Sequence, residues 1–123
     1  MMIFWIALGG GTGSVLRYLA QKQAHVLLGS QFPYGTLFVN VLGSFLFGYL
    51  AWVLVHRWPL DDDIRAGILV GLLGGFTTFS TFSNESLTLL MQGELSKVLV
   101  NVVFSVGLCI IAAALGLYLA KSV

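Results

Sequence analysis

Charged residues are scarce in this chain of 123 residues, which holds six Lys or Arg and five Asp or Glu, 9% in all. A soluble globule of this length needs far more polar surface. The net charge of +1 supplies no basic patch, so we expect no nucleic acid partner. Cysteine occurs once, at Cys109, which excludes an internal disulfide. With 58% hydrophobic residues and a mean hydropathy of +0.95, the composition is that of an integral membrane protein.

Apolar residues gather in four segments, separated by short connectors that contain Pro33, Pro59 and Gly93. Each segment approaches or exceeds the roughly 20 residues that cross a bilayer as a helix. The sequence therefore predicts an all-α integral membrane protein with a single four-helix transmembrane domain over residues 1–123. The expected spans are residues 2–28, 35–55, 64–91 and 98–119.

Lysine and arginine are almost evenly divided between the two ends of such a bundle. One end receives Arg57, Arg65 and Lys121, and the other receives Lys22 and Lys97, with Arg17 one turn deeper. A chain with balanced loop charges can insert in both directions, which permits an antiparallel homodimer. A single orientation fixed by a weak bias is the alternative, and the balance alone does not choose between them.

Small residues recur every four positions on three of the expected spans. Gly67, Gly71 and Gly75 do so on the third span, Gly9 and Gly13 on the first, and Ser44 and Gly48 on the second. Such spacing lets helix backbones approach closely in membranes. It predicts a compact bundle and indicates nothing about transport.

The third span contains the stretch GGFTTFSTFSNE, whose glycines and hydroxyls are unusual in a lipid-facing helix. Irregular backbone at membrane depth is tolerated where it faces protein or a watery cavity. We therefore expect the third helix to be broken near Gly74–Thr78. A break frees carbonyl oxygens that suit a small cation such as Na⁺. A simple kink healed by threonine side chains is the alternative interpretation.

Phenylalanines follow the expected break at helical spacing, with Phe79 and Phe82 three residues apart. Ring edges carry the positive part of the aromatic quadrupole, and hydroxyls donate hydrogen bonds, so this surface suits a small anion. Packing in a core is the other interpretation. Asn40, within the second span, offers two N–H donors to an ion or serves as an interhelical bond. Asn101 and Ser105, one turn apart on the fourth span, extend the same polar lining or bond across helices.

Three blocks, GGGTGSVLRY, GTLFVNVLGSFLFG and GLLGGFTTFSTFSNE, resemble the signature blocks of the Fluc fluoride channels, the CrcB family. The resemblance spans essentially the whole chain. It implies a dual-topology homodimer in the bacterial inner membrane that exports fluoride passively through two antiparallel pores, with Na⁺ at the dimer centre. The pore positions that it implies are Asn40, Phe79, Phe82, Ser80 and Thr81.

The resemblance assigns the Na⁺ ligands to the backbone carbonyls of Gly74 and Thr77. Arg17 and Glu85 match family positions at the vestibule or pore end, and Asn101 departs from the polar residue that some relatives carry. The partners that it implies are the fluoride ion, a second copy of the chain and the lipid membrane.

Two rival functions are disfavoured by the residues themselves. A small multidrug antiporter needs a membrane-embedded carboxylate in its first span, which has none. An enzyme needs a nucleophile beside a base, and no histidine or acid falls near the middle of a span, so we expect no enzymatic activity. A purely structural subunit explains the glycines but not the phenylalanines beside a break.

Overall fold

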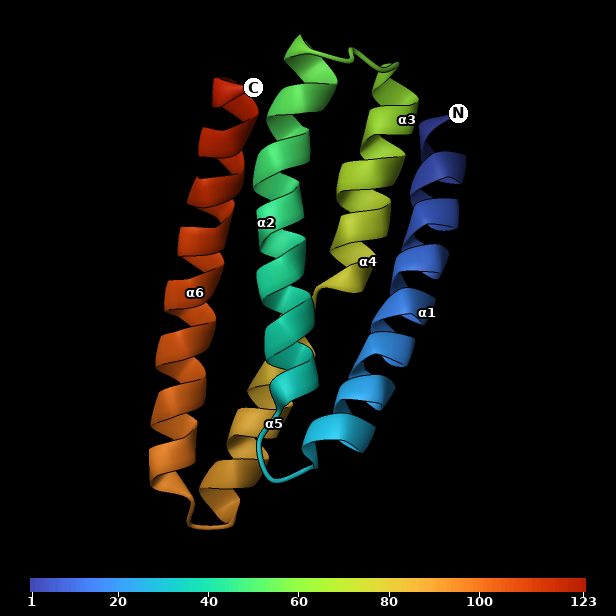
Figure 1. Ribbon diagram of the computed structural model, residues 1–123. Helices are drawn as coiled ribbons and strands as arrows, with labels where there is room; N and C mark the ends of the chain where they lie inside the picture. Colours follow the sequence, from blue (N-terminus) through green and yellow to red (C-terminus); the bar gives the residue numbers. More distant parts are fainter.

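The computed structural model describes all residues, 1–123, and contains helices and no strands (Figure 1). The all-α class is confirmed. In chain order the helices are α1 (Met2–Leu28), α2 (Tyr34–His56), α3 (Asp62–Ala66), the π-helix η1 (Gly67–Leu73), α4 (Gly74–Phe76), α5 (Phe79–Met91) and α6 (Leu95–Ser122).

Three helical segments are long and apolar enough to cross a membrane. They are Tyr34–His56, Asp62–Met91, which is interrupted, and Leu95–Ser122. Helix α1 has 27 residues, but the polar stretch GGGTGS and Arg17 lower its hydropathy, and it is not one of the three. The chain is a multi-pass membrane protein whose first helix is less apolar than the others.

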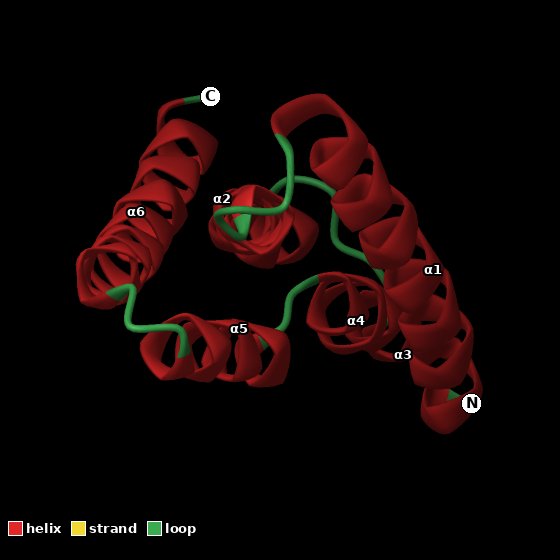
Figure 2. Ribbon diagram, turned by 90° about the horizontal axis from the view of Figure 1, so that it is seen from below, coloured by secondary structure: helices red, strands yellow, loops and turns green.

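Helix α2 lies in the middle of the bundle, with the other helices arranged around it (Figure 2). It packs along α6 on one side, while α1 packs against the segment α3, η1 and α4. Both termini lie at the end of the bundle where α2 connects to α3 (Figure 1).

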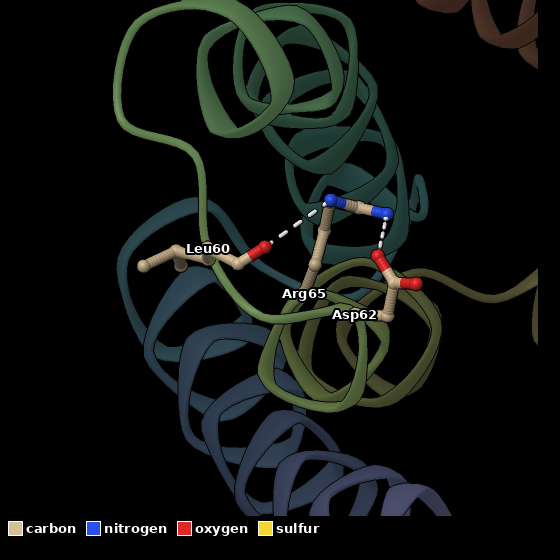
Figure 3. Close-up of polar contacts among 3 residues, drawn as sticks. All are labelled: Leu60, Asp62 and Arg65. Carbon is tan, nitrogen blue, oxygen red and sulfur yellow. Dashed lines mark hydrogen bonds and ion pairs between the residues drawn. The ribbon is translucent and has the colours of Figure 1, made fainter.

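The connector from α2 to α3 is closed by one arginine. Arg65 donates from Nη2 to the Asp62 carboxylate at 2.5 Å and from Nη1 to the Leu60 carbonyl at 3.3 Å (Figure 3). Asp61 precedes the first turn of α3 without accepting a bond from it through its side chain. The arginine therefore fixes the path of the chain into the third apolar segment.

Close backbone contacts join α1 to the third segment, as the glycine spacing predicts. A Cβ atom on Gly9 or Gly13 would collide with backbone atoms of residues 67–76. A Cβ atom on Gly75 would likewise collide with the backbone of Gly10. The same arrangement holds α2 on α6, where Gly48 faces the backbone of Ala113. These contacts are the small-residue seams of membrane helices.

The third segment is interrupted at Thr77 and Thr78, which are extended with φ/ψ of −93°/159° and −154°/121°. The break thus falls within the expected range Gly74–Thr78, at its last two residues. The glycines themselves remain helical, and Gly75 serves the close approach to α1. The π-helix η1, which precedes the break, is not indicated by the sequence pattern.

Candidate functional site: an interrupted helix beside two cavities

Asn40 binds both peptide groups of Thr78, the second residue of the break. The Thr78 N–H donates to Asn40 Oδ1 at 2.7 Å, and Asn40 Nδ2 donates to the Thr78 carbonyl at 3.0 Å. The side-chain amide therefore replaces hydrogen bonds that an intact helix would supply. One of the two Nδ2 protons remains for a further acceptor.

The carbonyl oxygens of Gly74 and Thr77 are among those that lose their helical donors at the break. In a continuous helix Thr78 N–H would bond to Gly74, but here it bonds to Asn40. The N–H of Thr81, which would bond to Thr77, instead donates to the Thr78 hydroxyl at 3.1 Å. The carbonyls of Gly74 and Thr77 are thus released from the helical ladder. No group of three His, Cys, Asp or Glu side chains is placed to hold a metal.

Arg17 of α1 turns toward the break. Its Nε donates to the Gly75 carbonyl at 3.0 Å, and no acidic group lies within ion-pair distance of it. The position of Arg17 along α1 suggests that it reaches the far membrane interface, as long basic side chains commonly do. The structure instead places this positive charge beside the interrupted helix.

Helix α5 starts immediately after the break because Thr78 caps it, accepting the Thr81 N–H through its side chain. The first turn carries Phe79 and Phe82, whose ring centroids are 5.4 Å apart with planes at 47°. Phe82 is 8% exposed and Phe79 is 76% exposed within the single chain. One ring is therefore packed inside the subunit and the other is presented at its surface.

A cavity of about 410 Å³ lies at the break and brings together six of the residues that the sequence singles out. They are Asn40, Gly74, Thr77, Phe79, Phe82 and Ser105. Its wall also includes residues that the sequence analysis does not assign, namely Thr78, Ser44, Phe47 and Cys109. The sequence does contain a signal for Thr78. It directly precedes the helical run that starts at Phe79, and threonine is a preferred residue at the N-cap of a helix.

A second cavity, of about 800 Å³, opens toward the end of the bundle where α1 connects to α2 and α5 to α6. Thr81 and Glu85 line it, together with Thr36 and Gln21. Gln21 donates to the Thr36 hydroxyl at 2.9 Å. Ser80 and Arg17 line neither of these two cavities, and Ser80 is exposed with its hydroxyl 3.4 Å from that of Thr78.

Glu85 is an acid inside the third membrane segment. Its Oε1 is buried and has no hydrogen-bond partner. The sequence places no acid near the middle of a span, and Glu85 indeed lies toward one end of the segment. The side chain as a whole is half-buried, so one carboxyl oxygen is enclosed while the residue lines the second cavity.

Asn101 lines neither cavity and is 2% exposed. Its Nδ2 donates to Ser86 of α5 at 2.9 Å, and its Oδ1 accepts from Ser105 at 3.2 Å. Of the two alternatives for this pair, Asn101 bonds across helices, while Ser105 contributes to the lining of the first cavity.

Apolar helices interrupted at a short extended segment, with freed backbone carbonyls beside a cavity, are typical of membrane transport proteins. That is the class that this fold and site define. Residues 4–117 match the family described as "CrcB-like protein, Camphor Resistance (CrcB)". The chain therefore belongs to the CrcB family, and the resemblance of its three sequence blocks to that family is confirmed.

Several curated relatives carry the name "Fluoride-specific ion channel FluC". The chain is 46% identical to one from Magnetococcus marinus, covering 98% of both chains, and 52% identical to one from Shewanella halifaxensis, covering 93% of this chain and 91% of that relative. It is 46% identical to one from Methylococcus capsulatus over 98% of its own length, but it spans only 53% of that relative.

Proposed function

We propose that this chain is a fluoride-selective channel that exports F⁻ passively and so lowers fluoride inside a bacterial cell. The observation that carries the proposal is the interrupted helix, at which Asn40, Phe79 and Phe82 share one cavity. The names of its relatives support fluoride as the ion. Membership of a family of channels identifies the chain as a transport protein and not an enzyme.

The pore lining that we propose consists of neutral groups with weak positive character. Phe79 and Phe82 present ring edges, and Asn40 has one N–H proton left after binding Thr78. The hydroxyls of Ser80 and Thr81 add donors at the start of α5. Many weak donors let a dehydrated anion enter and leave, whereas a single close ammonium group would retain it.

The assembly that we propose is an antiparallel homodimer with two pores, in the cytoplasmic membrane of a bacterium. The even division of basic residues between the two ends permits insertion in both directions. Phe79, 76% exposed in the single chain, is then covered by the second copy. Helix α1 serves as the fourth span, because its 27 residues exceed the length that a bilayer needs.

A structural Na⁺ at the centre of this dimer is part of the proposal. The residues present fit it, because the carbonyls of Gly74 and Thr77 have lost their helical donors and carbonyl oxygens suit a hard cation. The Gly75 carbonyl is disfavoured as a ligand, because it already accepts from the positively charged Arg17. The ion would supply positive charge that holds the two extended residues in place.

Arg17 and Glu85 complete the charge distribution near the break. Arg17 adds an unpaired positive charge that favours an anion on that side. Glu85, with its buried Oε1, lies in the second cavity, which we propose as a vestibule. Proton-coupled transport through Glu85 is the alternative to passive conduction, and fluoride efflux distinguishes the two.

The test is fluoride efflux from liposomes that contain the purified protein and a fluoride gradient. Passive conduction generates a diffusion potential, so efflux is slow until a potassium ionophore carries compensating charge. Chloride-loaded liposomes are the control and should lose little of their anion. Electroneutral efflux driven by a pH gradient would replace the channel with proton-coupled transport and point to Glu85.

A further inference from the structure

Asn101 is one of the largest fully buried side chains of the subunit, although it is polar. A buried amide is costly unless its polar atoms are bonded. Here Nδ2 donates to Ser86 Oγ at 2.9 Å and Oδ1 accepts from Ser105 at 3.2 Å, so both atoms have partners. The amide is therefore built into the junction of α5 and α6.

Helix α5 is attached to the rest of the bundle by few other contacts. The two extended residues of the break separate it from α4, and it lies at the edge of the bundle, beside α6 (Figure 2). Its packing against α2 is slight compared with that of α6. No other side-chain hydrogen bond joins α5 to α6.

The bond from Asn101 acts on the face of α5 that carries Phe82. Ser86 follows Phe82 by four residues, so the two side chains lie on the same face, one turn apart. Ser105 follows Asn101 by four residues on α6 and lines the cavity that Phe82 also lines. The hydrogen bonds that join Ser86, Asn101 and Ser105 thus connect the face of α5 that carries Phe82 with the part of α6 that lines the cavity.

We propose that Asn101 is a positioning residue for conduction, which sets the rotation of α5 on α6 and thereby the place of the Phe82 ring in the cavity. Asn101 lines neither cavity, so it acts through Ser86 and Ser105 and not by contact with the ion. The inference rests on the proposed fluoride conduction, but the placement of the ring can be measured without it.

The alternative is that Asn101 only joins two helices and contributes stability. Interhelical hydrogen bonds in membrane proteins contribute modestly to stability, so variants that lose the bond should fold. A site displaced by about 1 Å can lose much of its activity. A positioning role therefore changes flux and selectivity, whereas a purely structural role changes the melting temperature alone.

The experiment compares Ser86→Ala and Asn101→Leu with two controls. Ser86→Thr keeps the accepting hydroxyl, and Ser83→Ala makes the same change at an exposed serine whose hydroxyl bonds only to its own helix, at Phe79. Each purified variant is measured for fluoride efflux, for the fluoride-to-chloride permeability ratio and for its melting temperature. Fluorine NMR of 4-fluorophenylalanine in place of Phe82 reports the ring environment independently of conduction.

We expect Ser86→Ala and Asn101→Leu each to lower fluoride efflux about tenfold and to reduce the permeability ratio, as a displaced ring would. The double variant should be no worse than Asn101→Leu, because Asn101→Leu already removes the bond that Ser86→Ala breaks. Ser86→Thr and Ser83→Ala should match the wild type. The fluorine resonance of the labelled Phe82 ring should shift in the Ser86→Ala protein and stay unchanged in the Ser83→Ala protein.

Normal efflux and selectivity in a folded Ser86→Ala protein, with an unchanged ring signal, overturn the inference. Ser86→Ala removes a single oxygen and should therefore fold. If Asn101→Leu does not fold, Ser86→Ala alone tests whether the bond between Ser86 and Asn101 positions Phe82. A wild-type protein that carries no fluoride refutes the proposed function instead. In that case the ring signal still decides whether Asn101 positions Phe82.

Discussion

Asn40 and Thr78 are joined by two hydrogen bonds, of 2.7 and 3.0 Å, although 38 residues separate them in the chain. A side-chain amide has the same donor and acceptor as a peptide group, so Asn40 can pair with a residue that has left the helix. The two interpretations of Asn40 are therefore compatible. One Nδ2 proton of Asn40 is donated to the Thr78 carbonyl at the break, and the other remains for an acceptor in the cavity.

Asn40→Asp should abolish most of the fluoride flux. A carboxylate in this position sets an oxygen against the Thr78 carbonyl and adds negative charge beside an anion path. An unsatisfied buried group costs about 1–3 kcal/mol, so the break should loosen. Liposome efflux is the measurement, and elution of the purified protein shows whether it is still assembled. Wild-type flux in this variant would mean that Asn40 neither holds the break nor meets the ion.

Phe79→Ile and Phe82→Ile should each collapse fluoride flux while the protein still purifies intact. Isoleucine keeps most of the apolar bulk but removes the ring quadrupole. Swaps that conserve volume cost less than about 1.5 kcal/mol. Phe4→Ile, on the far helix α1, is the matched control and should conduct normally. If flux disappears only because the assembly falls apart, the two rings are core residues.

Thr77→Ser should be much milder than either phenylalanine change. The proposed ligand is the main-chain carbonyl, and serine keeps the hydroxyl that donates to Leu73 at 3.0 Å. The lost methyl packs against Gly43, so we expect a stability loss of about 1 kcal/mol from the small void. Efflux and thermal unfolding are compared in the same preparation. A severe loss of flux would assign the Thr77 side chain a direct role.

A tag at one terminus should be reachable from both sides of the membrane in a single population of cells. This follows from the proposed antiparallel dimer, whose two copies insert in opposite directions. An impermeant reagent applied to intact and to opened cells measures the two fractions. Labelling from one side only would show a single orientation.

Gly48→Ala should destabilise the protein, whereas Gly107→Ala should not. A Cβ atom on Gly48 collides with the backbone of Ala113, and overpacking of this kind costs about 1–3 kcal/mol. The space around Gly107 is open, and alanine there raises helix propensity by about 0.5–1 kcal/mol. Melting temperatures of the two purified variants should therefore move in opposite directions. Equal shifts would show that Gly48 is not a packing position.

The helices were predictable because length and apolarity are local properties of the sequence. The break was predictable for the same reason, since hydroxyls and glycines interrupt an apolar run. Its exact place was not, because the seam against α1 keeps Gly75 helical and moves the interruption to Thr77 and Thr78. The sequence shows that Gly74 and Gly75 are small, but it does not show that Gly75 lies against the backbone of α1.

The site was predictable as a set of residues but not as a set of bonds. Asn40 was recognisable as an amide within a membrane span, while its partner, Thr78, is set by how α2 lies against the third segment. Arg17 has the reach to extend to the interface, yet the freed Gly75 carbonyl offers it a partner inside the bundle. The link from Asn101 to Ser86 likewise depends on the relative rotation of α5 and α6.

The break at Thr77 and Thr78 also divides one membrane crossing between two sets of neighbours. The part before it, η1 and α4, packs on α1, and the part after it, α5, packs on α6. No continuous hydrogen-bond ladder connects the two halves, so strain in one is poorly transmitted to the other. The two halves meet only around the cavity, where Gly74 from the first half and Phe79 and Phe82 from the second form one wall, so a substitution far from Gly74 in the glycine seam changes stability with little effect on the phenylalanine helix.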